Sequence, residues 1–374
     1  MKQGAWIFII TILLFGSCDN KQSQMAEEEN ALEYAKEFSI LRADNFDLLK
    51  IPEPWQGSRR AYTYLLHHQE NFEVPDSLKG VIPIKVPVTS LVSNSTTHLP
   101  MLEVLKQEHV LKGFAQTQYI SSQKFIDRLD SGQIQEMGHN AQVNLEVVLD
   151  LNPQLFLAFN TSGDNKHLAQ IERSGIDLLY IADYKESSVL GRAEWIKVFG
   201  LLTDTQKESE TYFDQLVVRY DSLKGLTPVE RRPSVLSGTL YGGTWFAPNG
   251  ENYNSHLIGD AGGNYIFKNE SGDGWLNLDF EVVYSKGWDA DFWIGVANFN
   301  TLEELESMDG RYANFEAFKN GKAYTYNKRV NDKDANDYFE SGQLNPDRLL
   351  ADHIKILHPE ELPNYELYYY KKLD

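Results

Sequence analysis

The stretch NLEVVLDLNPQLFLA, residues 144–158, predicts the structural unit on which the fold depends. Asn144 is a favourable residue for the start of a short helix, and Glu146 falls in the first turn of that helix. A turn follows at Asn152-Pro153, and the apolar run 155–158 then indicates a buried strand. A helix, a tight turn and a buried strand in this order are typical of chains in which helices and strands alternate.

The same pattern returns in DFEVVYSKGWDADFWIG, residues 279–295. Asp279 takes the place of Asn144, Glu281 takes the place of Glu146, and the letters EVV recur before a second apolar strand. The chain therefore places an acidic residue in the first turn of a helix twice, 135 positions apart (281 minus 146). Because the repeat is short, chance similarity is an alternative explanation.

Strand and helix patterns alternate with short loops on both sides of a long helical segment, residues 190–225. Twenty residues of helix span roughly 30 Å, which is long enough to bridge two lobes. The sequence therefore predicts an α/β fold with two Rossmann-like lobes, each with a mainly parallel sheet, joined by a long rigid helix. We expect a hairpin extension at 31–85, an N-terminal α/β lobe at 86–189, the connecting helix at 190–225 and a C-terminal α/β lobe at 226–374.

Several segments carry more specific expectations. The turn chemistry of FSILRADNFDLLKI, residues 38–51, predicts a hairpin. The runs 84–92, 234–241 and 365–373 are each predicted as one strand, the last as a tyrosine-rich sheet edge. The segment 190–202 is predicted as a single helix.

The composition supports two packed domains. A chain of 374 residues is longer than one hydrophobic core usually organises, and 42% of its residues are hydrophobic. The formal net charge is −19, which argues against binding to nucleic acid and against lying flat on an anionic membrane. We therefore expect no nucleic-acid partner.

Residues 1–17 differ in kind from the rest of the chain. Lys2 precedes the apolar run WIFIITILLF, which is short for a membrane span and matches an export signal peptide. Cys18, the only cysteine, follows directly and resembles the lipobox cysteine of bacterial lipoproteins, which is diacylated, although Phe15 stands where Leu is usual. Residues 18–30 are polar and are predicted to form a tether. We expect a lipoprotein anchored to a membrane of the cell envelope and facing the periplasm; a plain secretory signal is the alternative.

From about residue 86 to residue 356, the chain resembles the substrate-binding proteins of ABC importers for iron complexes, haem and cobalamin. The most specific match is 144–158, because the family carries an Asn-Leu-Glu helix followed by an L-x-P-D-L-type strand; Gln154 stands where Asp is usual. The resemblance implies a binding protein and not an enzyme. The other matching stretches are VTSLVSNSTTHLPMLEVL (88–105), VLKGFAQTQY (110–119), LGRAEWIKVFGLL (190–202) and GWLNLDFEVV (274–283).

In that family, one glutamate on each lobe pairs with arginines of the permease. The resemblance assigns this role to Glu146 and Glu281, so that each lobe docks on one half of an ABC permease dimer. Charge pairs at the rim of an interface guide register and encounter more than they add affinity. The alternative is that each carboxylate only complements the dipole of its own helix, which is worth a few tenths to about 1 kcal/mol.

The resemblance also places the ligand between the lobes, at loops that follow strand ends. The expected ligand is a ferric chelate, haem or cobalamin, bound by a monomer that has no cofactor or metal of its own. Trp245 and Trp275 offer flat faces, although burial in a core is the ordinary role of such residues, and Arg329 is the best cation for an anionic iron complex. The candidate ligand-binding residues are Ser93, Asn94, Ser95, Thr96, Gln116 and Tyr119 in the first lobe, and Tyr241, Trp245, Trp275 and Arg329 in the second.

Three other functions are alternatives to this one. An enzyme is disfavoured because the sequence has no HExxH, G-x-S-x-G or P-loop motif. Zinc import would use histidines, and His98, His139 and His256 are conceivable ligands, but the sequence has no histidine-rich loop. A lipoprotein that only captures its ligand, or that partners an outer-membrane receptor, is also compatible with the sequence.

Overall fold

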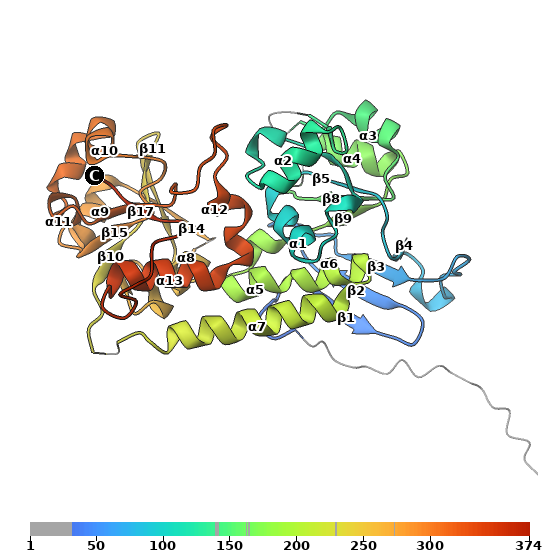
Figure 1. The fold of residues 1–374 in the computed structure, drawn as a ribbon, viewed down its shortest axis with the longest axis horizontal. Coiled ribbons are helices and arrows are strands. Elements are labelled where there is room, and N and C mark those ends of the chain that lie inside the picture. The colour runs from blue at the N-terminus through green and yellow to red at the C-terminus, as the bar shows by residue number, and fades with distance from the viewer. Residues whose placement is uncertain (1–31, 139–141, 162, 164, 229, 273) are drawn as a thin grey trace, which may run out of the picture.

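The structure, a computed structural model, describes residues 32–374 except 139–141, 162, 164, 229 and 273. The predicted signal peptide, most of the tether and the predicted lipidation site Cys18 therefore lie outside the described residues, as does His139. Two α/β lobes lie side by side, and helix α7 (Gln206–Lys224) runs beneath both of them (Figure 1). Among the described residues, no helix is both long enough and apolar enough to cross a membrane.

The first lobe is built around a five-stranded parallel sheet. Its strands are short and mostly buried, as expected for a parallel sheet covered on both faces. In their order across the sheet, the strands are β7 (Gln135–Glu136), β6 (Leu111–Phe114), β5 (Leu91–Ser93), β8 (Leu155–Ala158) and β9 (Leu178–Tyr180). The helices are α1 (Leu99–Val104), α2 (Gln123–Asp130), α3 (Leu145–Leu151) and α4 (Lys166–Arg173), with short 3-10 turns η2 (Thr96–His98), η3 (Glu108–Val110), η4 (Thr117–Tyr119) and η5 (Asp183–Lys185).

The unit at residues 144–158 folds as its sequence predicts. Asn144 caps α3, because its side chain accepts a hydrogen bond from the backbone amide of Glu146 at 3.0 Å. Asn152 ends the helix in the left-handed region, with φ of 41°. β8 follows and is buried at every position. Asparagine tolerates that backbone conformation better than most residues, so local sequence explains both ends of α3.

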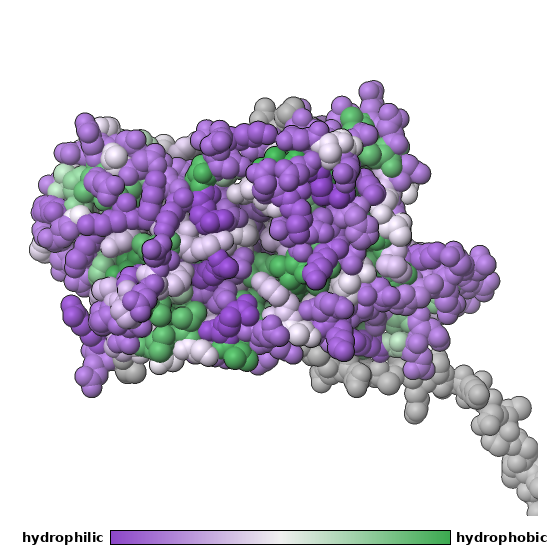
Figure 2. Space-filling view, viewed as in Figure 1, coloured by the Kyte–Doolittle hydropathy of each residue, from purple (hydrophilic) through white to green (hydrophobic). Residues whose placement is uncertain are grey.

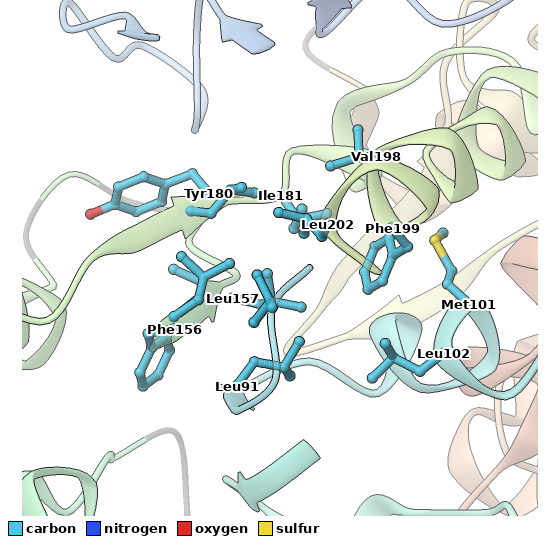
Figure 3. Close-up of a cluster of buried hydrophobic side chains, with 14 of the residues drawn as sticks. Leu91, Met101, Leu102, Phe156, Leu157, Tyr180, Ile181, Val198, Phe199 and Leu202 are labelled. Carbon is cyan, nitrogen blue, oxygen red and sulfur yellow. The ribbon is translucent and has the colours of Figure 1, made fainter. Parts of the chain in front are cut away.

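The core of the first lobe lies between its sheet, helix α1 and helix α6 (Ile196–Thr203) (Figure 3). Leu91 and Leu157 contribute from β5 and β8, Leu102 from α1 and Phe199 from α6, and all four side chains are essentially inaccessible to solvent. Burial of this kind is the main stabilising contribution to a fold, at roughly 1.5 to 3 kcal/mol for a large apolar side chain. The connector is therefore part of the first lobe's core.

A separate four-stranded sheet precedes the first lobe. The predicted hairpin is present as β1 (Ser39–Arg42) and β2 (Asp47–Ile51), which are antiparallel. β3 (Tyr62–His67), which the sequence did not predict, and β4 (Ile82–Lys85), which overlaps the start of the predicted strand 84–92, continue the sheet, and a 3-10 turn η1 (Asp76–Leu78) lies between them. Apolar residues of these strands belong to the same hydrophobic cluster as the first lobe. The extension is thus larger than a hairpin and shares the first lobe's core.

The amino-terminal segment, residues 33–37, is held by two buried glutamates. The carboxylate of Glu194 accepts hydrogen bonds from the backbone amides of residues 33–35 at 2.8 to 3.0 Å. The carboxylate of Glu186 accepts hydrogen bonds from the amides of residues 36–37 at 3.0 to 3.1 Å. Hydrogen bonds to an ionised acceptor are stronger than those between neutral groups. This segment is therefore fastened to the part of the chain that connects the lobes.

The connector has three helices instead of one continuous helix. The segment 190–202, predicted as a single helix, is divided at Trp195 between α5 (Val189–Glu194) and α6. Trp195 is fully buried, so the division follows from packing that local sequence does not reveal. Asp204 ends α6 in the left-handed region, with φ of 58°, and α7 then runs for 19 residues. At 1.5 Å per residue, α7 spans roughly 30 Å.

The second lobe has two sheets. Across its main sheet the strands are β13 (Asn264–Tyr265), β10 (Ser234–Leu236), β15 (Phe292–Ile294), β16 (Ala323–Thr325) and β17 (Lys371–Lys372), parallel except for the last pair. The smaller, antiparallel sheet has β11 (Thr239–Tyr241), β12 (Thr244–Pro248) and β14 (Trp275–Leu278). The helices and 3-10 turns are α8 (Tyr253–Asp260), α9 (Phe280–Gly287), α10 (Leu302–Met308), η6 (Gly310–Asn314), α11 (Glu316–Lys319), α12 (Asp337–Glu340), η7 (Gly342–Leu344) and α13 (Pro346–Leu357). Helix α13 contacts α7, which also contacts α6, so α7 is packed on both lobes.

Two predicted strands are each divided between two sheets. The run 84–92 is interrupted at Pro87, which has no backbone N–H to donate to a ladder. The run 234–241 is divided at Gly238, where φ is 89° and an added Cβ would lie 2.0 Å from the carbonyl oxygen of Phe246. Only glycine fits such a close approach between backbones. The predictions of single strands are therefore wrong at these two places.

The tyrosine-rich run 365–373 is a strand only at its end, in β17. The backbone amides of residues 368–370 instead donate to the buried carboxylate of Asp352 in α13, at 2.6 to 3.0 Å. A side chain from elsewhere in the chain thus takes the acceptor role that a neighbouring strand would have. The prediction of a continuous edge strand is wrong for this reason.

Candidate ligand-binding site

A cavity of about 480 Å³ is lined by residues of both lobes. In the first lobe, its lining residues follow the carboxyl ends of the neighbouring strands β5, β6 and β8, which is where ligands bind in open α/β sheets. Hydrophilic residues cover most of the molecular face in Figure 2, with smaller hydrophobic areas between them. Of the predicted first-lobe residues, those that line the cavity are Asn94, Ser95, Thr96, Gln116 and Tyr119.

Asn94 organises the first-lobe wall. Its Nδ2 donates to the carbonyl oxygen of Phe159 at 2.9 Å, and its Oδ1 accepts from the amide of Phe159 at 2.7 Å. These two hydrogen bonds hold the loop after β8 so that Phe159 lines the cavity beside Asn94. Tyr119 is 52% exposed at the same cavity, so its ring remains accessible to a ligand.

Ser93, also predicted as a ligand contact, lies behind this wall. It is fully buried, and its Oγ lies 2.7 Å from Nδ1 of His98. Burial lowers the pKa of His98 to about 4, because the charged imidazolium is poorly solvated there. A direct contact between Ser93 and a ligand does not fit this position. Ser93 and His98 instead support the loop that carries Asn94 and Ser95.

The buried carboxyl group of Asp183 joins the two lobes next to the cavity. Its Oδ2 accepts hydrogen bonds from Thr97 Oγ1 at 2.8 Å and, across the lobes, from Gln343 Nε2 at 2.5 Å. Thr97 and Gln343 line the cavity, whereas Asp183 is shielded behind them. Hydrogen bonds to a carboxylate are shorter and stronger than neutral ones, so this contact fixes the position of Gln343 against the first lobe.

Arg192 is a lining residue that the sequence analysis missed. Its guanidinium lies 3.6 Å from the ring centroid of Tyr253, a cation–π arrangement between α5 and α8. Its Nε and Nη2 donate to the carbonyl oxygens of Glu186 and Tyr184, at 3.2 and 2.5 Å. Arg192 falls within the segment predicted as connecting helix, where an arginine has no pattern that marks it as a cavity residue.

The second-lobe side of the cavity is formed largely by residues 331–343, which we call the interlobe strap. Asn331 Nδ2 donates to the carbonyl oxygen of Ile120 at 3.1 Å, and Glu340 accepts from backbone amides at the start of α2. The strap thus crosses from the second lobe to the first and closes one side of the cavity. The sequence of the strap contains no motif that predicts this role.

None of the three predicted aromatic residues of the second lobe lines the interlobe cavity. Trp245 is fully buried, stacks on Trp293 with ring centroids 5.4 Å apart, and donates from its indole nitrogen to Ser237 at 3.1 Å. Its predicted contact with the ligand is therefore wrong: it belongs to the second-lobe core. Tyr241 is 77% exposed on β11, and Trp275, half-exposed on β14, lines two neighbouring cavities of about 190 and 400 Å³.

Arg329 is also placed away from the interlobe cavity. Its Nε donates to Asp337 Oδ2 at 2.6 Å, and its guanidinium lies 4.2 Å from the ring centroid of Tyr368. Its charge is already paired within the second lobe. Among the described residues, Arg192 is the arginine that lines this cavity, and the prediction of Arg329 as a ligand contact finds no support there.

Both predicted docking glutamates are exposed on the first turn of a helix. Glu146 lies on α3, whose cap is provided by the side chain of Asn144. Glu281 lies on α9 with a side chain 77% exposed, and Arg311 Nη1 is 3.4 Å from its carboxylate. An ion pair this exposed contributes little to stability, so Glu281 remains accessible to another partner.

Metal ligation by the protein itself has no support in the described part of the chain. No group of three or more His, Cys, Asp or Glu side chains is arranged there to hold a metal ion. His98 is enclosed in the first lobe, and Nδ1 of His256 lies 2.9 Å from the carbonyl oxygen of Ser187. These two histidines therefore take part in separate local contacts.

Comparisons with known proteins agree with this architecture. A family model described as periplasmic binding protein matches residues 91–330, more than half of the chain. An uncharacterized lipoprotein of Methanocaldococcus jannaschii is 25% identical over 364 residues, which covers 91% of this chain and 85% of that protein.

Two solved structures have a similar fold. The periplasmic haem-binding protein HutB of Vibrio cholerae has a TM-score of 0.57 at 15% identity, covering 72% of this chain and 100% of that one. A possible iron-binding periplasmic solute-binding protein of Staphylococcus epidermidis has a TM-score of 0.56 at 16% identity, covering 73% and 99%. At these identities, the likeness concerns the fold alone.

Proposed function

Because the chain belongs to the periplasmic binding protein family, we propose that it captures a metal chelate between its lobes and delivers it to the permease of an ABC importer. Proteins of this family are solute-binding proteins and not enzymes, and they carry no cofactor of their own. The ligand that we propose is an iron-siderophore-type chelate, with haem and cobalamin as alternatives. Proteins of similar fold are named for haem binding and for possible iron binding.

The observation that carries this proposal is the interlobe cavity of about 480 Å³. Its volume falls within the range of small-molecule sites, and both lobes contribute polar groups and aromatic rings to its wall. A ligand held there contacts Asn94 and Tyr119 from one lobe and the interlobe strap from the other. Ligand binding is thereby coupled to the relative position of the two lobes.

Delivery to a permease is supported by the placement of Glu146 and Glu281. Glu146 and Glu281 are exposed on separate lobes, and each lies in the first turn of the helix that precedes a buried strand of a main sheet. A permease dimer offers two equivalent halves, and two matched charges on one molecule suit such a surface. Rim charges of this kind speed and orient the encounter, with an effect that weakens as salt is added.

Attachment to a membrane through Cys18 is part of the proposal. The cysteine follows an export-signal pattern, and a relative that covers most of the chain is named a lipoprotein. A lipid anchor keeps a binding protein near its permease and raises the effective concentration of one for the other.

The test is an uptake assay in cells that carry the cognate permease and lack the native gene. Replacement of both Glu146 and Glu281 by Ala should abolish uptake of a labelled ferric siderophore, while the purified variant binds it with unchanged affinity. Asp150→Ala provides a matched control, because Asp150 is another exposed acidic residue on α3. Unchanged uptake by the double variant would favour a lipoprotein that only captures its ligand.

A further inference from the structure

The interlobe cavity is poor in charge. Among the described residues that line it, Arg192 and Asp334 alone carry a formal charge at neutral pH. The other lining residues offer amides, hydroxyl groups, aromatic rings and aliphatic carbon. One positive and one negative group leave the wall with no net charge, so the ligand meets no surplus of cations there.

The single cation of the wall is already engaged. Nε and Nη2 of Arg192 donate to two backbone carbonyl oxygens, and its flat face lies on the ring of Tyr253. An arginine bound in this way is fixed in place and has one edge left for a ligand. It is equipped to hydrogen-bond one oxygen-bearing group, and it does not supply the several positive charges that a multiply charged anion needs.

Carboxyl groups stand near the same cavity. Asp334 lines it directly, and the fully buried Asp183 lies behind Thr97 and Gln343. Neither hydrogen-bonding partner of Asp183 carries a positive charge. His98 nearby is held neutral by burial. Transfer of an anion from water into the cavity therefore brings it close to carboxyl groups. The free energy of this transfer is unfavourable unless the site supplies enough positive charges.

The field of the whole chain acts in the same direction. Its formal net charge of −19 repels an anionic solute during approach and attracts a cationic one. This long-range effect is reduced by salt, whereas the effect of the enclosed wall is screened much less.

We propose that the cavity selects metal chelates that carry no net negative charge, such as ferric trihydroxamates and corrinoids, over trianionic ferric triscatecholates and over haem with its two carboxylates. This inference rests on the proposed function and names the ligand class for the same site. Amides and hydroxyl groups of the wall, such as those of Gln116 and Asn298, hydrogen-bond the polar groups of a neutral chelate. Tyr119, Phe159 and Phe339 contact its apolar surface.

The experiment compares four probes with the purified protein by quenching of tryptophan fluorescence, at fixed pH and about 0.15 M salt, a physiological ionic strength. The probes are a cationic ferric trihydroxamate, cyanocobalamin, a trianionic ferric triscatecholate and haemin. At least one of the first two should bind no less than tenfold more tightly than both of the others. If an anionic probe binds as tightly or more tightly, charge selection is overturned and the proposed function stands. If none of the four binds, both proposals fall.

Two variants test whether the wall sets this order. Asn298→Lys adds a cation at an exposed lining position, and it should strengthen binding of the trianionic probe at least tenfold. Asp334→Asn should weaken binding of the cationic trihydroxamate more than binding of neutral cyanocobalamin. Circular dichroism checks that both variants are folded. Folded variants with the wild-type order of affinities would contradict the proposal.

Discussion

The Oε2 atom of Glu340 lies 2.6 Å from the backbone nitrogen of Ser121, although the two residues are 219 positions apart and belong to different lobes. The other carboxylate oxygen of Glu340 accepts from the amide of Ser122 at 2.9 Å. One side chain of the interlobe strap thus binds two amides next to the start of α2. Glu340 is buried, so this contact joins the lobes away from solvent.

Stability should depend on pH through Glu340. Burial, with smaller contributions from Asp337 and Glu103, raises the pKa of Glu340 to about 8 from 4.5, against the opposing effect of the amides of Ser121 and Ser122. Because the folded-state pKa is the higher one, the contribution of Glu340 to stability is complete below pH 4.5 and is lost as the pH rises to about 8.

The variant Glu340→Gln cannot titrate, so its free energy of unfolding should decline less than that of the wild type between pH 4.5 and 8. Each tenfold change in proton affinity corresponds to about 1.4 kcal/mol. Urea unfolding at a series of pH values measures the difference, and Glu366→Gln, at an exposed position, serves as the control. Parallel pH profiles for wild type and Glu340→Gln would show that this carboxyl group is not responsible.

The two tryptophans predicted to bind ligand should respond differently to truncation. Trp245→Ala should lower the free energy of unfolding by about 3 to 5 kcal/mol, because a large ring is removed from a packed core. Trp275→Ala should change it by about 0.5 kcal/mol or less, because that ring is half-exposed. Chemical denaturation of both variants decides the matter. Similar losses for the two would contradict the assignment of Trp245 alone to the core.

Removal of the Glu194 carboxylate should detach the amino-terminal segment. Glu194 accepts three backbone hydrogen bonds from residues 33–35 and pairs with Lys197, whose Nζ lies 2.7 Å away. Glu194→Ala removes the buried acceptor of three partly buried backbone amides, so we expect a loss of about 3 kcal/mol. Limited proteolysis should then cleave near residues 33–37 at lower protease concentrations. Glu33→Ala, an exposed change in the same segment, should have neither effect.

Closure on ligand binding should be small. α7 packs on both lobes, and the segment joining it to the first lobe is itself part of that lobe's core. A wide hinge motion would have to break the packing of α7 on α6 or on α13, so it is not expected. Solution scattering with and without a bound chelate should give nearly the same radius of gyration. A pronounced compaction would contradict this expectation.

Local sequence was sufficient for the elements whose ends depend on neighbouring residues. Asn144 and Asn152 delimit α3 by capping and by a left-handed backbone, and the apolar run after them forms β8. The polar loop that starts at Asn94 reaches the cavity because strand ends in a parallel sheet share one edge. These inferences need only the pattern of one segment at a time.

Sequence reasoning failed where a residue's role depends on distant partners. Trp245 follows two glycines in a loop-like stretch, yet the pairing of β12 turns its ring into the core. Arg192 lines the cavity where α5 packs on α8, with its guanidinium over the ring of Tyr253. In each case the deciding contact is tertiary.

The fastening of residues 33–37 to Glu194 and Glu186 determines where a mechanical load enters the molecule. Force applied along the chain from its amino-terminal side reaches five backbone amides first and passes from them to the junction of the lobes. No sheet of the described residues lies in that path ahead of the junction, because β1 begins at Ser39. An attachment at the connector leaves Glu146 and Glu281 outside the contacts that carry this load.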